Sequence, residues 1–233
     1  MADQKVCVVA GVGPGLGLAL VKAFAAEGYA VAALARNIDA LDALVGSIDG
    51  AYAFACDVTD EAGVHSTFEA IRSQLGPISA LMYNAGSGVW GTLDDIEVAN
   101  LEMSWRVNTL GLFHLTRAAI ADLRATKGAL GITGATAALR GKPKTLAFAS
   151  SKAAQRSMAQ SFARQLGPEG VHVFYAIIDG MIDLPKTRQM MPDAPEDFFL
   201  KPDEIAAAYV QVAHQPQSAW TFELDLRPYR EQW

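Results

Sequence analysis

The sequence predicts an α/β fold in which about seven parallel strands form one doubly wound sheet with helices on both faces. Short apolar runs alternate with longer amphipathic stretches along the 233 residues, which is the rhythm of βαβ units. The apolar runs are continuous rather than alternating, as expected for strands that helices cover on both faces. A glycine-rich turn at residues 11–17, between the first strand and the first helix, completes the pattern.

Seven runs have the length and residue types of strands. They are Val6–Ala10, Ala30–Ala35, Ala51–Ala55, Ile78–Tyr83, Gly128–Thr133, Val171–Ile178 and Thr221–Leu226. Helices are expected over Leu16–Glu27, Glu61–Gln74, Val98–Thr126, Ala149–Gln165 and Asp203–Ala213. No linker or internal repeat separates these elements, so residues 1–233 are expected to form a single domain.

Only the segment at residues 179–202 interrupts the alternation. It is rich in proline and aspartate and contains the pairs Met190-Met191 and Phe198-Phe199. An irregular stretch of this length inside a compact domain is usually functional or disordered, and we predict a substrate lid here. Its apolar side chains, together with Trp90, suggest an apolar ligand, although core packing explains such residues equally well.

Composition and charge narrow the possible functions. Hydrophobic residues make up 51% of the chain and charged residues 19%, which excludes a disordered polypeptide. The net charge of −6 gives no general attraction to nucleic acid or to an anionic membrane surface. No apolar run reaches the roughly 18 residues of a membrane span, so a cytoplasmic protein is expected.

Neither a disulfide nor a metal site is predicted. Cys7 and Cys56 lie in or beside apolar runs, where a thiol commonly packs as a small hydrophobic group. The four histidines are separated by long intervals and have no cysteine or histidine cluster beside them.

The turn after the first strand reads Ala10-Gly11-Val12-Gly13-Pro14-Gly15-Leu16-Gly17. Its glycines at 11, 15 and 17 follow a G-x3-G-x-G spacing, which lets the backbone approach a pyrophosphate at the positive end of a helix. A tight turn without a ligand is the simpler alternative. Because the glycines follow a strand and open a helix, the context favours a Rossmann-type dinucleotide site.

Arg36, at the end of the second strand, bears on which dinucleotide is bound. An acidic residue at this place usually binds the ribose 2′-hydroxyl of NAD, whereas an arginine accommodates the 2′-phosphate of NADP. The chain has Ala35-Arg36-Asn37, which favours NADP and leaves NAD as the second choice. A solvated surface arginine is the alternative interpretation.

Further motifs occur in order along the chain: Asp57-Val58 after the third strand, Asn84-Ala85-Gly86 after the fourth, Asn108 in the long helical stretch, and Lys152 opening the next helix. With the glycine turn, they make the chain resemble the short-chain dehydrogenase/reductase family over essentially its whole length. The resemblance implies a Rossmann-type fold, a nicotinamide dinucleotide and hydride transfer.

The resemblance also implies roles for individual residues. Asp57 would contact the adenine, residues 84–86 would flank the adenosine ribose, Lys152 would hold the nicotinamide ribose, and Asn108 would position a proton-relay water. Together, the residues expected to contact the cofactor are Gly11, Gly15, Leu16, Gly17, Arg36, Asp57, Val58, Asn84, Ala85, Gly86, Lys152 and Ile182.

The chain departs from the family pattern at the residues that face the substrate. Phe148 stands four residues before Lys152, where the family has the tyrosine that exchanges a proton with the substrate. The family serine falls near Ala135, and Thr136, one residue later, is its possible replacement. Lys152, Asn108 and Thr136 are therefore the expected catalytic residues.

Asp179 and Asp183 are further candidates for the proton donor, because a partly desolvated carboxyl can act as an acid. An ordinary surface turn that carries two aspartates is the alternative. The closing run 217–228 together with Phe148 resembles a divergent branch of the family in which phenylalanine replaces the tyrosine.

Two functions follow from this pattern. The first is an NADP(H)-dependent oxidoreductase that acts on a small, apolar carbonyl or alcohol with a non-standard proton donor. The second is an NADP-binding protein without redox turnover, acting as a sensor or a partner subunit. A domain that binds no nucleotide would leave the glycine turn, Arg36 and residues 84–86 unexplained together.

The surplus of apolar residues over 98–126 predicts a homodimer or homotetramer.

Overall fold

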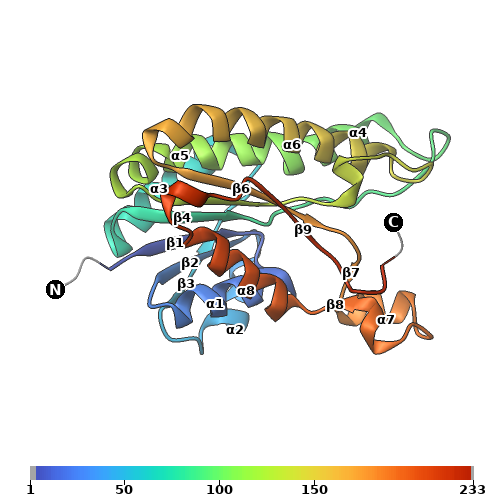
Figure 1. The fold of residues 1–233 in the computed structure, drawn as a ribbon, viewed down its shortest axis with the longest axis horizontal. Helices are drawn as coiled ribbons and strands as arrows, with labels where there is room; N and C mark the ends of the chain where they lie inside the picture. The colour runs from blue at the N-terminus through green and yellow to red at the C-terminus, as the bar shows by residue number, and fades with distance from the viewer. Residues whose placement is uncertain (1–3, 232–233) are drawn as a thin grey trace.

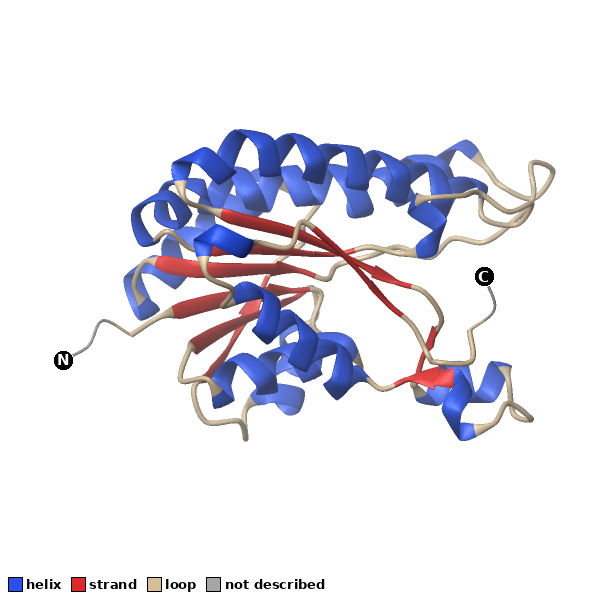
Figure 2. Cartoon of the chain, viewed as in Figure 1, coloured by secondary structure: helices blue, strands red, loops and turns tan. Residues whose placement is uncertain are grey.

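The computed structural model describes residues 4–231 and contains one seven-stranded sheet between two layers of helices (Figures 1 and 2). Its strands are β1 Val6–Ala10, β2 Ala30–Ala35, β3 Ala51–Ala55, β4 Ile78–Tyr83, β5 Ala129–Thr133, β6 His172–Ile178 and β9 Glu223–Leu226. They lie in the order β3-β2-β1-β4-β5-β6-β9, and each neighbouring pair is parallel. The predicted fold class is confirmed.

Helices cover both faces of the sheet, as Figure 1 shows. One layer consists of α1 Leu16–Ala26, α2 Ile38–Val45 and α8 Pro202–Ala213. The other consists of α3 Glu61–Leu75, α4 Val98–Trp105, α5 Gly111–Thr126 and α6 Leu146–Leu166. From β1, the chain first adds β2 and β3 on one side and then returns to add β4 and the later strands on the other side. Sheets of this kind bind ligands at the carboxyl ends of the strands on either side of this change, here β1 and β4.

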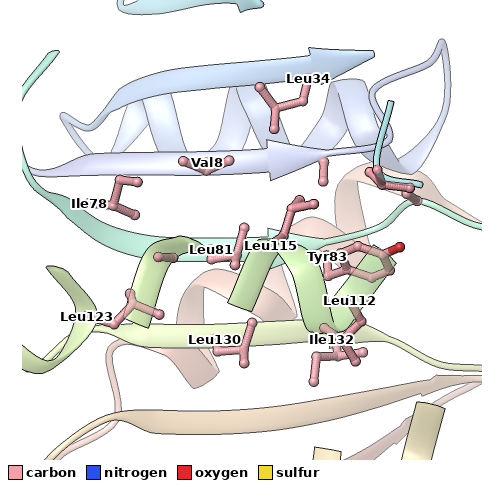
Figure 3. Close-up of a cluster of buried hydrophobic side chains, with 14 of the residues drawn as sticks. Val8, Leu34, Ile78, Leu81, Tyr83, Leu112, Leu115, Leu123, Leu130 and Ile132 are labelled. Atoms are coloured by element: carbon pink, nitrogen blue, oxygen red, sulfur yellow. The ribbon is translucent and has the colours of Figure 1, made fainter. Parts of the chain in front are cut away.

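Each face of the sheet has its own hydrophobic core. On the side of α3, α5 and α6, side chains such as Val8, Leu81 and Ile132 from the strands pack against Leu112 and Leu115 from α5 (Figure 3). On the other side, the alternate strand residues pack against α1, α2 and α8. Because consecutive strand residues point to opposite faces, both sets must be apolar, which explains the continuous apolar runs in the sequence.

Several predicted boundaries differ from the structure. The strands expected to begin at Gly128, Val171 and Thr221 begin one or two residues later. Helix α2 was not predicted. It is only eight residues long, and the Asn37 side chain caps it by accepting a hydrogen bond from the Ala40 N–H at 3.1 Å.

The long helix predicted over 98–126 is interrupted by a π-helical turn, Arg106–Leu110, between α4 and α5. Such turns often occur at functional sites, and this one carries Asn108. Helix α6 begins at Leu146, three residues earlier than predicted, so Lys152 lies in its second turn rather than at its start.

The segment at 179–202 is more regular than predicted. It contains the short strands β7 Met181–Ile182 and β8 Phe199–Leu200, which pair in parallel, and between them the helix α7 Pro185–Met190. Asp183 forms ion pairs with Arg188 at 2.7 Å and with Lys201 at 2.6 Å, and both cations also contact Glu196. The segment is therefore a small folded unit beside the carboxyl edge of the sheet (Figure 1).

No helix within residues 4–231 is long and apolar enough to cross a membrane. Over the same residues, no group of three histidine, cysteine or acidic side chains is arranged to hold a metal ion. Residues 1–3 and 232–233, the ends of the predicted domain, lie outside the described part of the chain.

Candidate cofactor pocket and active site

A cavity of about 870 Å³ opens at the carboxyl ends of β1, β2, β3 and β4. Seven of the predicted cofactor residues line it: Gly11, Arg36, Asp57, Val58, Asn84, Ala85 and Gly86. Its volume lies within the range of ordinary small-molecule sites. Sequence reasoning missed the part of the wall that comes from α2, including Leu41 and Leu44, because it did not predict that helix.

The other predicted cofactor residues lie outside this cavity: Gly15, Leu16, Gly17, Lys152 and Ile182. Gly15, Leu16 and Gly17 form the start of α1, where the first backbone N–H groups of a helix have no partner within the helix. The segment at 179–202 reaches this place, since a β-carbon on Gly15 would collide with Leu184.

The glycine turn is packed too closely to admit other residues at its key positions. Gly11 has a φ of +82°, and a β-carbon there would lie 2.5 Å from the Ala85 backbone. A β-carbon on Gly17 would lie 2.6 Å from the carbonyl oxygen of Gly11. Asn84 fixes this arrangement, because its Nδ2 donates to the Gly11 carbonyl at 2.9 Å and its Oδ1 accepts from the Thr133 hydroxyl at 3.1 Å.

We expect Gly11→Ala to destabilise the protein and to weaken dinucleotide binding. Gly28→Ala is a matched control, since Gly28 has the same φ of +82° but open space around it. A positive φ alone costs an alanine about 1–2 kcal/mol, and the collision with Ala85 adds to this cost only at residue 11. Thermal unfolding of both variants measures the difference, and equal losses of stability would contradict the close packing.

Arg36 and Asp57 line the cavity from the ends of β2 and β3, and both side chains are exposed. Asp57 accepts hydrogen bonds from the Thr59 backbone N–H at 2.9 Å and from the Thr59 hydroxyl at 2.8 Å. The backbone hydrogen bond is the main cause that lowers the pKa of Asp57, and Arg36 acts in the same direction. The wall therefore presents one fixed cation and one carboxylate to a ligand.

The side chain of Asn108 joins three segments. Its Nδ2 donates to the carbonyls of Ser87 at 3.0 Å and Ser104 at 2.9 Å and to the hydroxyl of Ser151 at 3.1 Å. Its backbone carbonyl accepts a hydrogen bond from Gln155 Nε2 at 2.6 Å. The expected relay water at Asn108 stays a prediction, and any such water would share this carbonyl with Gln155.

Lys152 is almost completely buried, with 4% of its surface exposed. Its Nζ donates to the Thr133 carbonyl at 2.8 Å and to Gln155 Oε1 at 3.1 Å. Both acceptors are neutral, and burial lowers the pKa of Lys152 to about 7. The site thus holds an amine that changes charge close to neutral pH.

Phe148 lies beside this amine, as the sequence spacing predicts. The centre of its ring is 5.9 Å from Lys152 Nζ and 5.5 Å from the centre of the Trp90 ring. Trp90 itself is 63% exposed. The place expected for a proton-donating tyrosine is therefore occupied by an apolar aromatic pair.

A second polar group lies at the start of the segment at 179–202. The Thr136 hydroxyl donates a hydrogen bond to Asp179 Oδ1, and Arg227 lies 3.4 Å from Asp179 Oδ2. Asp179 is 7% exposed. Sequence reasoning selected Thr136 and Asp179 but missed Arg227, which comes from the loop after β9 far along the chain.

Asp183 is a poor candidate for the proton donor. Hydrogen bonds from Arg188 and Lys201 lower the pKa of Asp183 far below its usual value, which keeps the carboxyl ionised. Of the two aspartates singled out in the sequence, Asp179 is the one whose carboxylate contacts a predicted catalytic side chain.

The fold and the site together define a dinucleotide-binding α/β protein. Residues 5–194 match the family model described as short chain dehydrogenase, and the chain belongs to that family. The predicted family is thus confirmed, and the protein is of the oxidoreductase type.

Individual relatives agree with this result. A rat 3-oxoacyl-[acyl-carrier-protein] reductase is 27% identical over 219 residues, which cover 91% of this chain and 92% of the relative. The structure of an alcohol dehydrogenase from Thermococcus sibiricus, complexed with 5-hydroxy-NADP, has a TM-score of 0.88 at 25% identity and covers 99% of both chains. An NADPH-bound short chain oxidoreductase from Pseudomonas aeruginosa, described as containing an atypical catalytic center, has a TM-score of 0.87 at 25% identity and covers 98% of both.

Proposed function

We propose that this protein is an NADP(H)-dependent oxidoreductase that interconverts a small, apolar carbonyl compound and its alcohol. The observation that carries the proposal is the cavity in which the glycine turn, the 84–86 turn and Arg36 meet. The NADPH in the Pseudomonas structure and the NADP analogue in the Thermococcus structure support NADP as the cofactor, with NAD as the second choice.

Arg36→Ala should weaken NADPH binding much more than NADH binding. A hydrogen bond to a charged group contributes about 1.5–3 kcal/mol, which corresponds to a loss of roughly tenfold or more in affinity for NADPH. Titration of the wild type and the variant with each nucleotide, followed by nicotinamide fluorescence, measures the loss of affinity for NADPH and for NADH. Arg164→Ala is the matched control, since Arg164 is exposed on α6 and its guanidinium donates to the Gln160 carbonyl of the same helix. An equal loss for both nucleotides would remove the assignment of Arg36 to the 2′-phosphate.

The bound dinucleotide supplies or accepts the hydride, and the chain has to orient the substrate and move one proton. We assign the binding of the nicotinamide ribose to Lys152, since its ammonium has three donors and the two protein acceptors use only two of them. The apolar pair Trp90 and Phe148 beside it would exclude water from the reacting centre.

Thr136 and Asp179 are the proposed route for the proton. In oxidation, Thr136 would take the proton of the alcohol while its own hydroxyl proton passes to the Asp179 carboxylate, to which it is hydrogen-bonded. In reduction, the same protons would move in the opposite direction, from an Asp179 that has first taken up a proton from solvent. The small unit at 179–202 begins at this aspartate and would serve as the lid over the substrate.

We also propose that the protein is a homodimer or homotetramer. Leu101, Trp105 and Phe113 on α4 and α5 remain partly exposed, while Leu112 and Leu115 of the same stretch are fully buried. The exposed residues are the apolar surplus that an interface would cover. Sedimentation that returns only a monomer would contradict this assignment.

A spectrophotometric screen with small aldehydes, ketones and quinones tests the activity. We expect consumption of NADPH with at least one apolar member of the panel. Stoichiometric binding of NADPH without consumption across the panel would instead indicate a cofactor-binding protein without turnover, the function that the missing hydroxyl at Phe148 leaves open.

A further inference from the structure

Gln155 connects the two polar groups at the centre of the site. It lies on α6 three residues after Lys152, so both side chains project from the same face of the helix, and its own side chain is fully buried. Its Nε2 donates to the backbone carbonyl of Asn108 at 2.6 Å, and its Oε1 accepts from Lys152 Nζ at 3.1 Å. One amide group therefore bridges the π-helical turn and the buried amine.

The partners of this amide fix its orientation. The Asn108 carbonyl can only accept a hydrogen bond, so it must face the NH₂ group of Gln155. The Tyr175 hydroxyl donates to Gln155 Oε1 at 3.4 Å from the other side. Turning the amide over would break the hydrogen bonds to the Asn108 carbonyl and from Lys152, because it would place oxygen against oxygen and N–H against N–H. Gln155 can thus present only an acceptor to Lys152.

An acceptor that cannot become a donor discriminates between the two forms of an amine. The ammonium form donates charge-assisted hydrogen bonds, which are about twice as strong as those of a neutral donor. The second acceptor of Lys152 Nζ, the Thr133 carbonyl, has the same property. Within residues 4–231 no carboxylate forms an ion pair with Lys152, so these two oxygens are what opposes the effect of burial.

The titratable side chains that contact Lys152 or its two acceptor residues are neutral, and Arg156, one turn further along α6, is paired with Glu223. Tyr175 on β6 and Tyr209 on α8 are buried, and burial raises the pKa of both hydroxyls far above neutral pH. Tyr209 donates to the Thr133 hydroxyl at 2.8 Å, and Tyr175 contacts the Lys152 backbone carbonyl at 3.4 Å. On its own helix, Lys152 faces the uncharged ring of Phe148. None of these groups supplies a compensating negative charge.

We propose that Gln155, which is hydrogen-bonded to the π-helical turn, is a positioning residue that favours the ammonium form of Lys152 and directs its Nζ toward the cofactor ribose. The inference rests on the proposed function for the identity of the ligand. The effect on the charge of Lys152, in contrast, is a property of the chain alone and can be measured without any ligand.

The primary test is the pKa of Lys152, measured by NMR on the full-length protein with ¹³C-labelled lysine, with the resonance assigned through Lys152→Met. Gln155→Met removes the acceptor with little change in side-chain size. We expect it to shift the protonation equilibrium of Lys152 about tenfold toward the neutral amine. Gln155→Glu places a carboxylate at the same position and should shift the equilibrium toward the ammonium form. Gln165→Met, at an exposed position on the same helix, should leave it unchanged.

A second readout is the affinity for NADPH as a function of pH. At pH 6 the Gln155→Met variant should bind NADPH within about twofold of the wild type, because about half or more of Lys152 is charged in both, whereas at pH 8 the variant should bind about tenfold more weakly. A purely structural role for Gln155 would give the same loss at both values.

The possible outcomes separate the two claims. An unchanged pKa of Lys152 in both Gln155 variants, or in Gln155→Glu alone if Gln155→Met does not fold, would overturn the inference. If the wild type binds neither nucleotide but the pKa shifts as expected, the proposed function fails and the role of Gln155 in setting the charge of Lys152 stands.

Discussion

Phe148→Tyr is expected to increase the rate of NADPH-dependent carbonyl reduction by about 10²- to 10⁴-fold, which is the usual contribution of a positioned general acid. The new hydroxyl would extend from a ring whose centre is 5.9 Å from Lys152 Nζ. A nearby ammonium would stabilise the phenolate that remains after proton transfer. The measurement is kcat/KM for the best substrate of the screen, for the wild type and the variant.

Two controls accompany this substitution. Phe148→Leu removes the ring without adding a hydroxyl and should not increase the rate. Thr136→Val removes the proposed proton route, so it should reduce the rate in the wild-type background and have a much smaller effect when combined with Phe148→Tyr. If Phe148→Tyr leaves kcat/KM unchanged or lowers it, the geometry around residue 148 does not support the family's usual proton transfer.

Lys152→Met should abolish turnover and weaken the binding of NADPH. The substitution removes the donors of the ammonium but keeps an apolar chain of similar length in an almost completely buried place. The pKa of Lys152 is about 7, so the fraction of ammonium falls as the pH rises through this value. In the wild type the affinity for NADPH should therefore decrease between about pH 6 and pH 8, while in Lys152→Met it should lose this pH dependence.

Lys144→Met, at an exposed position in the loop before α6, is the matched control and should preserve both turnover and the pH dependence. Circular dichroism would verify that Lys152→Met is folded. Unchanged turnover in a folded Lys152→Met variant would contradict the catalytic assignment of this residue.

The parts of the fold that the sequence predicted are those with a strong local signal. Continuous apolar runs identify the strands of the central sheet, since their burial on both faces follows from the helices on either side. Helix α2 escaped prediction because its eight residues make only about two helical turns, and β7 and β8 escaped because two residues show no alternation. The π-helical turn at 106–110 was invisible for another reason: it depends on partners such as the Tyr83 hydroxyl, which reaches the Val107 carbonyl from β4.

The residues of the candidate site likewise fall into those that the sequence reveals and those whose surroundings arise only on folding. The glycine turn and Arg36 follow strands directly, so their place at the carboxyl edge is evident from the sequence. The environment of Lys152 depends on contacts that arise only on folding, with Thr133 from β5 and Gln155 one helical turn away. Arg227 reaches Asp179 from the end of another strand. Spacing to Lys152 could have singled out Gln155, since a glutamine one turn after a predicted site lysine, on a helix face that packs inward, needs buried partners.

The most direct test of the central claim is to follow the hydride itself. Wild-type protein is incubated with NADPH that carries deuterium at C4 of the nicotinamide and with the best substrate of the screen, and the alcohol product is examined by mass spectrometry. An NADP(H)-dependent oxidoreductase should place one deuterium in the product for each NADP⁺ formed, and NADH should react far more slowly. Saturable NADPH binding with no deuterium in any product would contradict the proposed function and leave a cofactor-binding protein without turnover.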